Sequence, residues 1–305
     1  MRIYFFATMM ASIIAFFGFT DNLQAGVISQ RPVHKLSIID DNEREKPKIL
    51  SAAWGTHAKS FCPNRPERDF DNMPVTFNWF IKPSSFKATD FIVYNEEGVA
   101  IQPVCALQWP PDESDEQQTI NLIGYFGAPK DGQRPTKVYV LGELTGHPPG
   151  ATRWRKIGLL TKKIIQLEAA PFIVDAWPIP AKIYKGDANR CKKGAQFVRV
   201  MWSNGITAYP TGEEVGDAVV SSYRAVFKLP SGDMLEIKPL SVADLNDHPP
   251  YPALDDNMHD LCLPASPPES QLSEIRIDEN LVQDPNGDPN EAQYFIVHKF
   301  KKIHK

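Results

Sequence analysis

The sequence predicts an all-β protein of two tandem β-sandwich domains that follow an N-terminal signal peptide. Two observations carry this prediction. Short stretches of alternating apolar residues, bounded by Gly, Pro, Asn and Asp, recur along the chain, and a spacing of roughly ten residues between such stretches is typical of sandwich strands. The second observation is an internal repeat, which divides the chain into two halves of similar pattern.

The first 25 residues have the pattern of a secretory signal peptide. In MRIYFFATMMASIIAFFGFTDNLQA one arginine precedes an apolar run, and polar and small residues follow it. We expect residues 1–25 to be removed after Ala25. The apolar run is short for a bilayer span, so an uncleaved membrane anchor is the less favoured alternative. With no later apolar stretch of sufficient length, the mature chain is expected to be secreted or periplasmic, without a stable membrane span.

The internal repeat starts with PKILSAAWG from Pro47 and with PFIVDAWPI from Pro171. A cysteine follows each segment, and then a strand pattern of alternate apolar residues that ends in Trp79 or Trp202. Each half continues through a predicted hairpin with a glycine in its turn, as in YNEEGVA and LPSGDML. We therefore assign residues 26–44 to an N-terminal linker, 45–150 to domain 1, 151–169 to a linker that is helix or strand, and 170–305 to domain 2.

The last strand of each half is predicted from TKVYVLGEL and AQYFIVHKF. On this alignment the loops before these strands, GAPKDGQRP and DPNGDPN, are equivalent strand connections rich in turn-forming residues. Domain 2 is longer because of an acidic loop insertion expected at 241–265.

Four cysteines are expected to form two disulfides, because the chain carries an export signal and none of its cysteines has C-x-x-C spacing. Together with the tryptophan-bearing strands, they resemble immunoglobulin or fibronectin type III sandwiches in general plan. That resemblance concerns architecture and transfers no functional residue. Of the three possible connectivities, pairing within each domain is the most economical: Cys62 with Cys105, and Cys191 with Cys262.

The charge of the chain excludes some partners. The formal net charge is −4, and a mildly acidic surface argues against nucleic acid and anionic lipid as main partners. The basic C-terminal run HKFKKIHK is too short to change this conclusion. The expected partner is therefore a protein or a glycan.

Calcium is the main alternative to a plain turn in the stretch LVQDPNGDPNEAQYF. Its acids and asparagines alternate like the first ligands of an EF-hand. The match then fails, because Pro289 stands where an EF-hand has glycine and Phe295 where it has a bidentate glutamate. A turn is the favoured interpretation. A calcium site would combine this loop with the second acidic cluster, through Asp255, Asp256, Asp284, Asn286 and Asp288.

Other chemistry has weaker support in the sequence. His248 and His259 are candidates for a zinc site or a catalytic dyad, but their spacing matches no known zinc pattern. The motifs G-x-S-x-G and H-E-x-x-H, a P-loop and a dinucleotide fingerprint are all absent. We therefore expect a non-catalytic binding, adhesion or envelope-associated protein without a cofactor. A calcium-dependent binding domain and an exported hydrolase with an unrecognised site are the alternatives.

The six tryptophans divide into two groups. Four occupy repeat positions and are expected in the two cores: Trp54, Trp79, Trp177 and Trp202. The other two, Trp109 in LQWPPDESDE and Trp154 in TRWRK, are expected at the surface. Exposed rings of this kind stack on sugars or on partner proteins, so Trp109 and Trp154 are the candidate ligand-binding residues.

Overall fold

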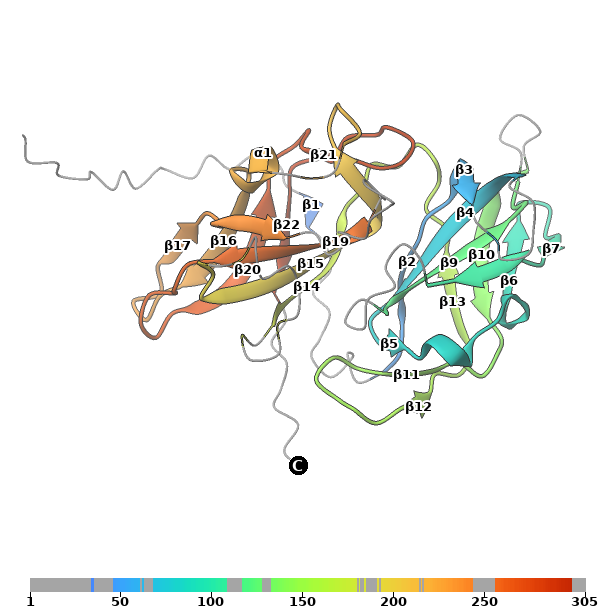
Figure 1. The fold of residues 1–305 in the computed structure, drawn as a ribbon, viewed down its shortest axis with the longest axis horizontal. Helices are drawn as coiled ribbons and strands as arrows, with labels where there is room; N and C mark the ends of the chain where they lie inside the picture. The colour runs from blue at the N-terminus through green and yellow to red at the C-terminus, as the bar shows by residue number, and fades with distance from the viewer. Residues whose placement is uncertain are drawn as a thin grey trace, which may run out of the picture. The chain divides into compact units, whose positions relative to one another are not determined.

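A computed structural model describes most of the chain after residue 45 (Figure 1). About half of the described residues lie in strands, and most of the others lie in turns and loops, with one short α-helix, α1 (Asp217–Val220), and two 3-10 turns. The signal peptide lies outside the described residues. The described ranges are 34–35, 46–60, 62, 68–108, 117–127, 133–179, 181, 184, 191, 193–213, 215, 217–243 and 256–297.

The first half of the chain forms two main sheets. The order of the first sheet is β2-β4-β9-β8, with strands Ile49–Ala52, Arg68–Phe77, Thr119–Gly124 and Cys105–Leu107. The order of the second is β13-β10-β6-β7, with strands Leu160–Lys163, Pro135–Val140, Phe91–Asn95 and Ala100–Ile101. An additional strand, β3 (Gly55–Ser60), pairs with β4.

The second half repeats this plan. The order of its first sheet is β14-β15-β19-β18, with strands Ile173–Ile179, Gln196–Ala208, Asp256–Leu263 and Ser241–Ala243. The order of its second sheet is β22-β20-β16-β17, with strands Gln293–Ile296, Gln271–Ile277, Tyr223–Lys228 and Met234–Ile237. A short strand from the predicted N-terminal linker, β1 (His34–Lys35), runs parallel to β22.

Taken in chain order, the two halves have the same strand positions. Strand β4 corresponds to β15, β6 to β16 and β10 to β20, and the edge strand β13 corresponds to β22. The tryptophan-bearing strands of the predicted repeat are thus equivalent. So are the hairpins, because β6 pairs with β7 and β16 with β17.

This correspondence corrects the predicted closing strands. TKVYVLGEL contains β10, an interior strand that pairs with both β6 and β13, whereas β22 in AQYFIVHKF matches the edge strand β13. The strand of the first half that corresponds to β22 is therefore β13, which lies in the segment 151–169 that was expected to be helix or strand. Accordingly the loops GAPKDGQRP and DPNGDPN are not equivalent, since they precede strands at different positions in the sheet.

The acidic insertion is also corrected. Residues 241–243 and 256–263 form β18 and β19, which pair antiparallel with each other. Only residues 244–255 of the expected loop remain, and they lie outside the described residues. In β19 the polar residues Asn257, His259 and Asp260 are buried.

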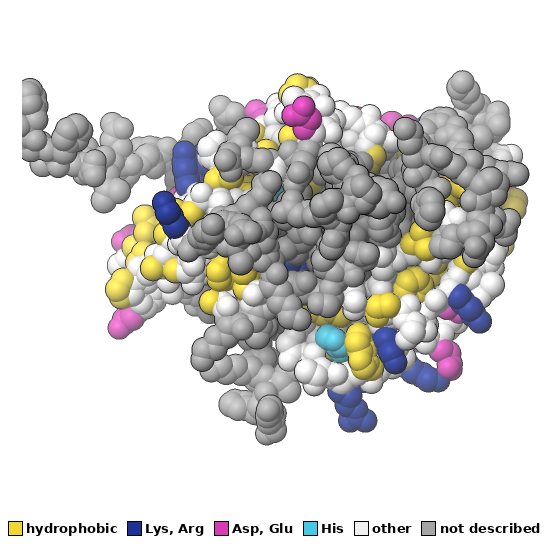
Figure 2. Space-filling view, in the orientation of Figure 1, with side chains coloured by type: hydrophobic (Ala, Val, Ile, Leu, Met, Phe, Trp, Pro, Cys, Tyr) yellow, Lys and Arg dark blue, Asp and Glu magenta, His cyan; other side chains and the backbone are white. Residues whose placement is uncertain are grey.

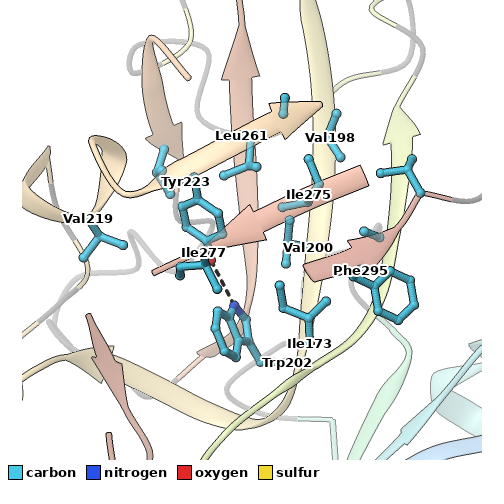
Figure 3. Close-up of a cluster of buried hydrophobic side chains, with 14 of the residues drawn as sticks. Ile173, Val198, Val200, Trp202, Val219, Tyr223, Leu261, Ile275, Ile277 and Phe295 are labelled. Atoms are coloured by element: carbon cyan, nitrogen blue, oxygen red, sulfur yellow. Dashed lines mark hydrogen bonds between the residues drawn. The ribbon is translucent and has the colours of Figure 1, made fainter. Parts of the chain in front are cut away.

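Each pair of sheets encloses its own apolar core. In β15, Val198, Val200 and Trp202 enter one core while Phe197 and Met201 point to the opposite face, because successive side chains of a strand alternate. Figure 3 shows this core, in which the Trp202 indole donates a hydrogen bond of 3.2 Å to the Tyr223 hydroxyl. The other core is built around Met73, Val75 and Phe77 of β4.

The two disulfides have the expected connectivity. Cys62 is joined to Cys105 and Cys191 to Cys262, with Cα–Cα distances of 6.0 and 5.5 Å. They close segments of 43 and 71 residues, for which the chain-entropy treatment gives about 4 kcal/mol of stabilisation each. Among the described residues, no helix has the length and apolar character needed to cross a bilayer.

Candidate functional site

The structure separates the tryptophans as the sequence predicts, where they are described. Trp54, Trp79, Trp177 and Trp202 are at most 4% exposed. Trp177, however, is buried outside the two expected cores, in a separate cluster with Met201 and Met258. Trp154 is 38% exposed, and Trp109 lies outside the described residues. Of the two predicted surface rings, Trp154 is therefore the one whose surroundings can be described.

Trp154 belongs to a small aromatic cluster on a three-stranded sheet of order β12-β11-β5, with strands Arg155–Lys156, Thr145–His147 and Phe80–Ile81. The His147 ring lies 4.5 Å from the Trp154 ring and 5.3 Å from that of Phe80. Figure 2 shows a histidine beside hydrophobic and basic side chains at the surface. His147 contacts Trp154 edge to face, and the exposed basic residues Arg153, Arg155 and Lys156 lie next to Trp154 in the chain.

The loop DPNGDPN is organised by its own side chains. One carboxylate oxygen of Asp284, Oδ1, accepts hydrogen bonds from the backbone N–H groups of Asn286 and Asp288, at 2.9 and 3.1 Å. The other oxygen accepts from Nδ2 of Asn286 at 3.1 Å. Asn290 is buried and accepts from the N–H groups of Leu281 and Val282. The alternating Asp and Asn residues therefore have a structural role in a turn after β21 (Val282–Gln283).

The predicted calcium ligands are only partly described. Asp255 lies outside the described residues, and Asp256 is described in its backbone alone, at the start of β19. Within the described part of the chain, no three His, Cys, Asp or Glu side chains converge as metal ligands would. Burial raises the pKa of the Asp284 carboxyl, against the lowering effect of its hydrogen bonds. Calcium binding at these residues stays a prediction.

Replacing Asp284 by alanine is expected to destabilise the protein in excess EDTA by about 1 kcal/mol, because the backbone N–H groups of Asn286 and Asp288 lose the carboxylate that accepts their hydrogen bonds. Urea unfolding measures this loss. Asp288→Ala is the matched control, since no hydrogen bond of the Asp288 carboxylate is found in the described ranges. A loss that appears for Asp284→Ala only after calcium is added would instead make Asp284 a metal ligand.

His259 lies in the core. It is 2% exposed, and its Nδ1 is 2.8 Å from the Tyr223 hydroxyl oxygen. Burial lowers the pKa of His259 to about 3 and raises that of Tyr223, so both side chains are neutral at pH 7. The zinc site or dyad considered with His248 thus has one member in a core, and the other lies outside the described residues.

Next to His259, Asp260 forms a buried ion pair with Arg199 on the opposite face of the same sheet. The two residues are directly paired across β15 and β19. Nε and one terminal nitrogen of Arg199 donate to the two carboxylate oxygens of Asp260, at 2.9 and 3.0 Å. Both side chains are at most 1% exposed. Asp260, which was expected in an acidic loop, is therefore part of a buried ion pair between two strands of the sheet.

A surface that the sequence analysis missed lies on the outer side of the sheet β13-β10-β6-β7. Because Val93, Val138 and Val140 enter the core, their neighbours along each strand point outward. Two cross-strand rows result: Tyr94, Lys137 and Lys163; and Ile92, Tyr139 and Thr161. We call these six residues the tyrosine face.

The tyrosine face is partly exposed, because its lysines and Thr161 are exposed while Ile92 and the two tyrosines are half-buried. The Tyr94 and Tyr139 rings meet edge to face at 5.3 Å, and the Lys137 ammonium lies 5.9 Å from the centre of the Tyr139 ring. No hydrogen bond of either phenolic hydroxyl is found among the described residues. A hollow of about 510 Å³ is lined by Tyr94, Asn95, Glu96, Gly98, Thr136, Lys137, Tyr139 and Leu141.

The signal for this face is present in the sequence. In TKVYV the residues Lys137 and Tyr139 alternate with Val138 and Val140, which predicts one buried and one exposed side. Comparison with known proteins adds nothing to this geometry, because no protein-family model matches the chain. No curated protein shows a significant match to its sequence either.

Proposed function

We propose that this chain is an exported, non-catalytic glycan-binding protein made of two immunoglobulin-like domains, and that it binds its ligand on the tyrosine face. The proposal rests on the strand order of the two halves, on the disulfides and on the half-buried tyrosines that line the hollow. Each of these three supports a different part of it.

The strand order supports the immunoglobulin-like assignment. Lettered in chain order, strands β2, β4, β6, β7, β8, β9, β10 and β13 become A, B, C, C′, D, E, F and G. The sheets are then A-B-E-D and G-F-C-C′ in both halves. Sandwiches of the immunoglobulin type pair an A-B-E-D sheet with a G-F-C sheet. On this basis the first domain extends beyond residue 150 to include β13.

The disulfides support export. Structural disulfides form and persist in oxidising compartments outside the cytosol, and the described structure contains two of them. This agrees with the signal peptide predicted at residues 1–25. A secreted or periplasmic location is therefore part of the proposal.

The single observation that carries the binding function is the hollow beside Tyr94 and Tyr139. Tyrosine offers an apolar ring to the C–H side of a sugar and a hydroxyl to its polar groups. A rigid sheet presents these rings with little cost in conformational entropy on binding. His259 is buried and neutral, so we assign it a packing role.

Screening the mature chain, residues 26–305, against immobilised neutral and acidic oligosaccharides tests this function. We expect binding to at least one glycan, and a loss of up to about tenfold in affinity for Tyr139→Ala, since one aromatic contact contributes roughly 0.5 to 1.5 kcal/mol. Trp154→Ala is the matched control, because it removes an exposed aromatic ring elsewhere. If Trp154→Ala abolishes binding and Tyr139→Ala does not, the site belongs to the His147 and Trp154 cluster instead.

A further inference from the structure

The tyrosine face contains two lysines at directly opposed positions of neighbouring strands. Lys137 of β10 is the cross-strand partner of Lys163 of β13, and both side chains are exposed. Like charges directly opposite each other destabilise a sheet. Within the described ranges neither lysine forms an ion pair with a carboxylate. The face thus carries a concentrated positive charge that the fold itself leaves uncompensated there.

Two other charged residues lie near this pair. Lys162, the neighbour of Lys163, is directly opposite Val138 and therefore lies on the core side of the sheet, not on the tyrosine face. Glu96 lines the hollow, but it acts on Arg134, whose pKa is raised mainly by its hydrogen bond to Glu168 and also by Glu96. This basic area stands out against a chain whose net charge is −4.

The same arrangement argues against a second copy of the chain as the occupant. A two-fold dimer through this face would bring two such lysine pairs together, because an isologous interface places the same patch on both subunits. An anionic ligand instead relieves the repulsion between Lys137 and Lys163. The complementary partner is therefore negatively charged, and the two tyrosine rings favour one with flat apolar surfaces.

We propose that the tyrosine face binds an acidic polysaccharide, a chain of uronic acid units, whose carboxylates pair with Lys137 and Lys163 while a sugar ring packs against Tyr94 and Tyr139. Such a chain carries sugar carboxylates beside apolar ring C–H groups, and on the face the two lysines lie beside the two tyrosines, Tyr94 in the same row and Tyr139 in the next. This inference rests on the proposed glycan-binding function and deepens it by naming the class of ligand.

Titration with polygalacturonate, and separately with its fully methyl-esterified form, tests the inference. The ester keeps the sugar rings and removes the charge. We expect the acidic polymer to bind about tenfold or more tightly than the ester, because two ion pairs at an exposed site are worth roughly this factor together. Binding of the acidic polymer should also weaken as salt is raised.

Substitutions of the two lysines test whether they cause the preference for the acidic polymer. The double change Lys137→Gln and Lys163→Gln should remove the preference for the acidic polymer, and Lys137→Arg with Lys163→Arg should keep it. Lys228→Gln with Lys238→Gln is the matched control, which changes the net charge equally in the second half of the chain. An equal loss in this control would overturn the inference, because the effect would then come from overall charge.

Other outcomes separate this inference from the proposed function. Equal binding of both polymers, lost in Tyr139→Ala, would disprove the acidic ligand and keep the glycan-binding function. Binding to neither polymer nor any other glycan would overturn both. Binding to vesicles of anionic lipid with the same dependence on Lys137 and Lys163 would replace the polysaccharide by a membrane surface.

Discussion

Replacing Asp260 by alanine is expected to destabilise the protein by about 3 to 5 kcal/mol, because the Arg199 guanidinium would lose its bidentate partner while remaining buried. Both groups are removed from solvent, at 1% and 0% exposure. Water therefore cannot replace the carboxylate without opening the sheet between β15 and β19. Urea unfolding of the purified mature protein measures the loss.

Asp278 supplies the control for this prediction. Its carboxylate is 67% exposed and lies 3.6 Å from Arg224, and a surface pair of this kind contributes at most about 1 kcal/mol. Arg199→Met combined with Asp260→Leu should be less destabilised than Asp260→Ala alone, since the double variant removes both charges of this pair. Equal stability of Asp260→Ala and the wild type would show that the pair is open to solvent.

Lowering the pH from 7 to 5 is expected to reduce the free energy of unfolding by about 2 kcal/mol through His259 alone. Burial holds the pKa of His259 at about 3, while the ordinary value for a histidine is 6.5. Below the ordinary value the unfolded chain binds a proton that the folded protein does not. Stability contributed by the neutral, buried imidazole is thus present above pH 6.5 and is lost progressively down to about pH 3.

Unfolding curves at pH 7, 6 and 5 measure this dependence. His259→Gln should lack the pH-dependent part of the loss, whatever its stability at pH 7. His147→Gln, which alters a surface histidine next to Trp154, should keep it. A His259→Gln variant with an unchanged pH profile would mean that the titrating group is elsewhere in the protein.

The alternating pattern was sufficient for several features of the fold. Strand β15 and its tryptophan, the hairpin at Gly232 and the burial of Trp54 are all local consequences of apolar residues at alternate positions. The connectivity of the disulfides followed from the repeat, because each half contains two cysteines. None of these features required knowledge of which strands become neighbours.

The sequence did not predict which strands lie next to each other in a sheet. Strands β10 and β22 were both predicted to be the last strand of a domain. An interior strand and an edge strand can have the same alternation of apolar and polar residues, so the sequence does not distinguish them. Asp260 read as a loop acid, because its partner Arg199 lies 61 residues away. The tyrosine face was missed for the same reason: Lys137 meets Lys163 only when β10 pairs with β13.

The sequence by itself determined the all-β class, the two similar halves, the cysteine pairs and the turn-forming character of the DPNGDPN loop. These depend on side-chain period and on local backbone preference, which act within a few residues. The tertiary structure alone decided which strands lie side by side, which charges are buried in pairs, and which side chains share an exposed face. Those outcomes depend on contacts between residues far apart in the chain, which form only when the sheets assemble and bury their apolar sides.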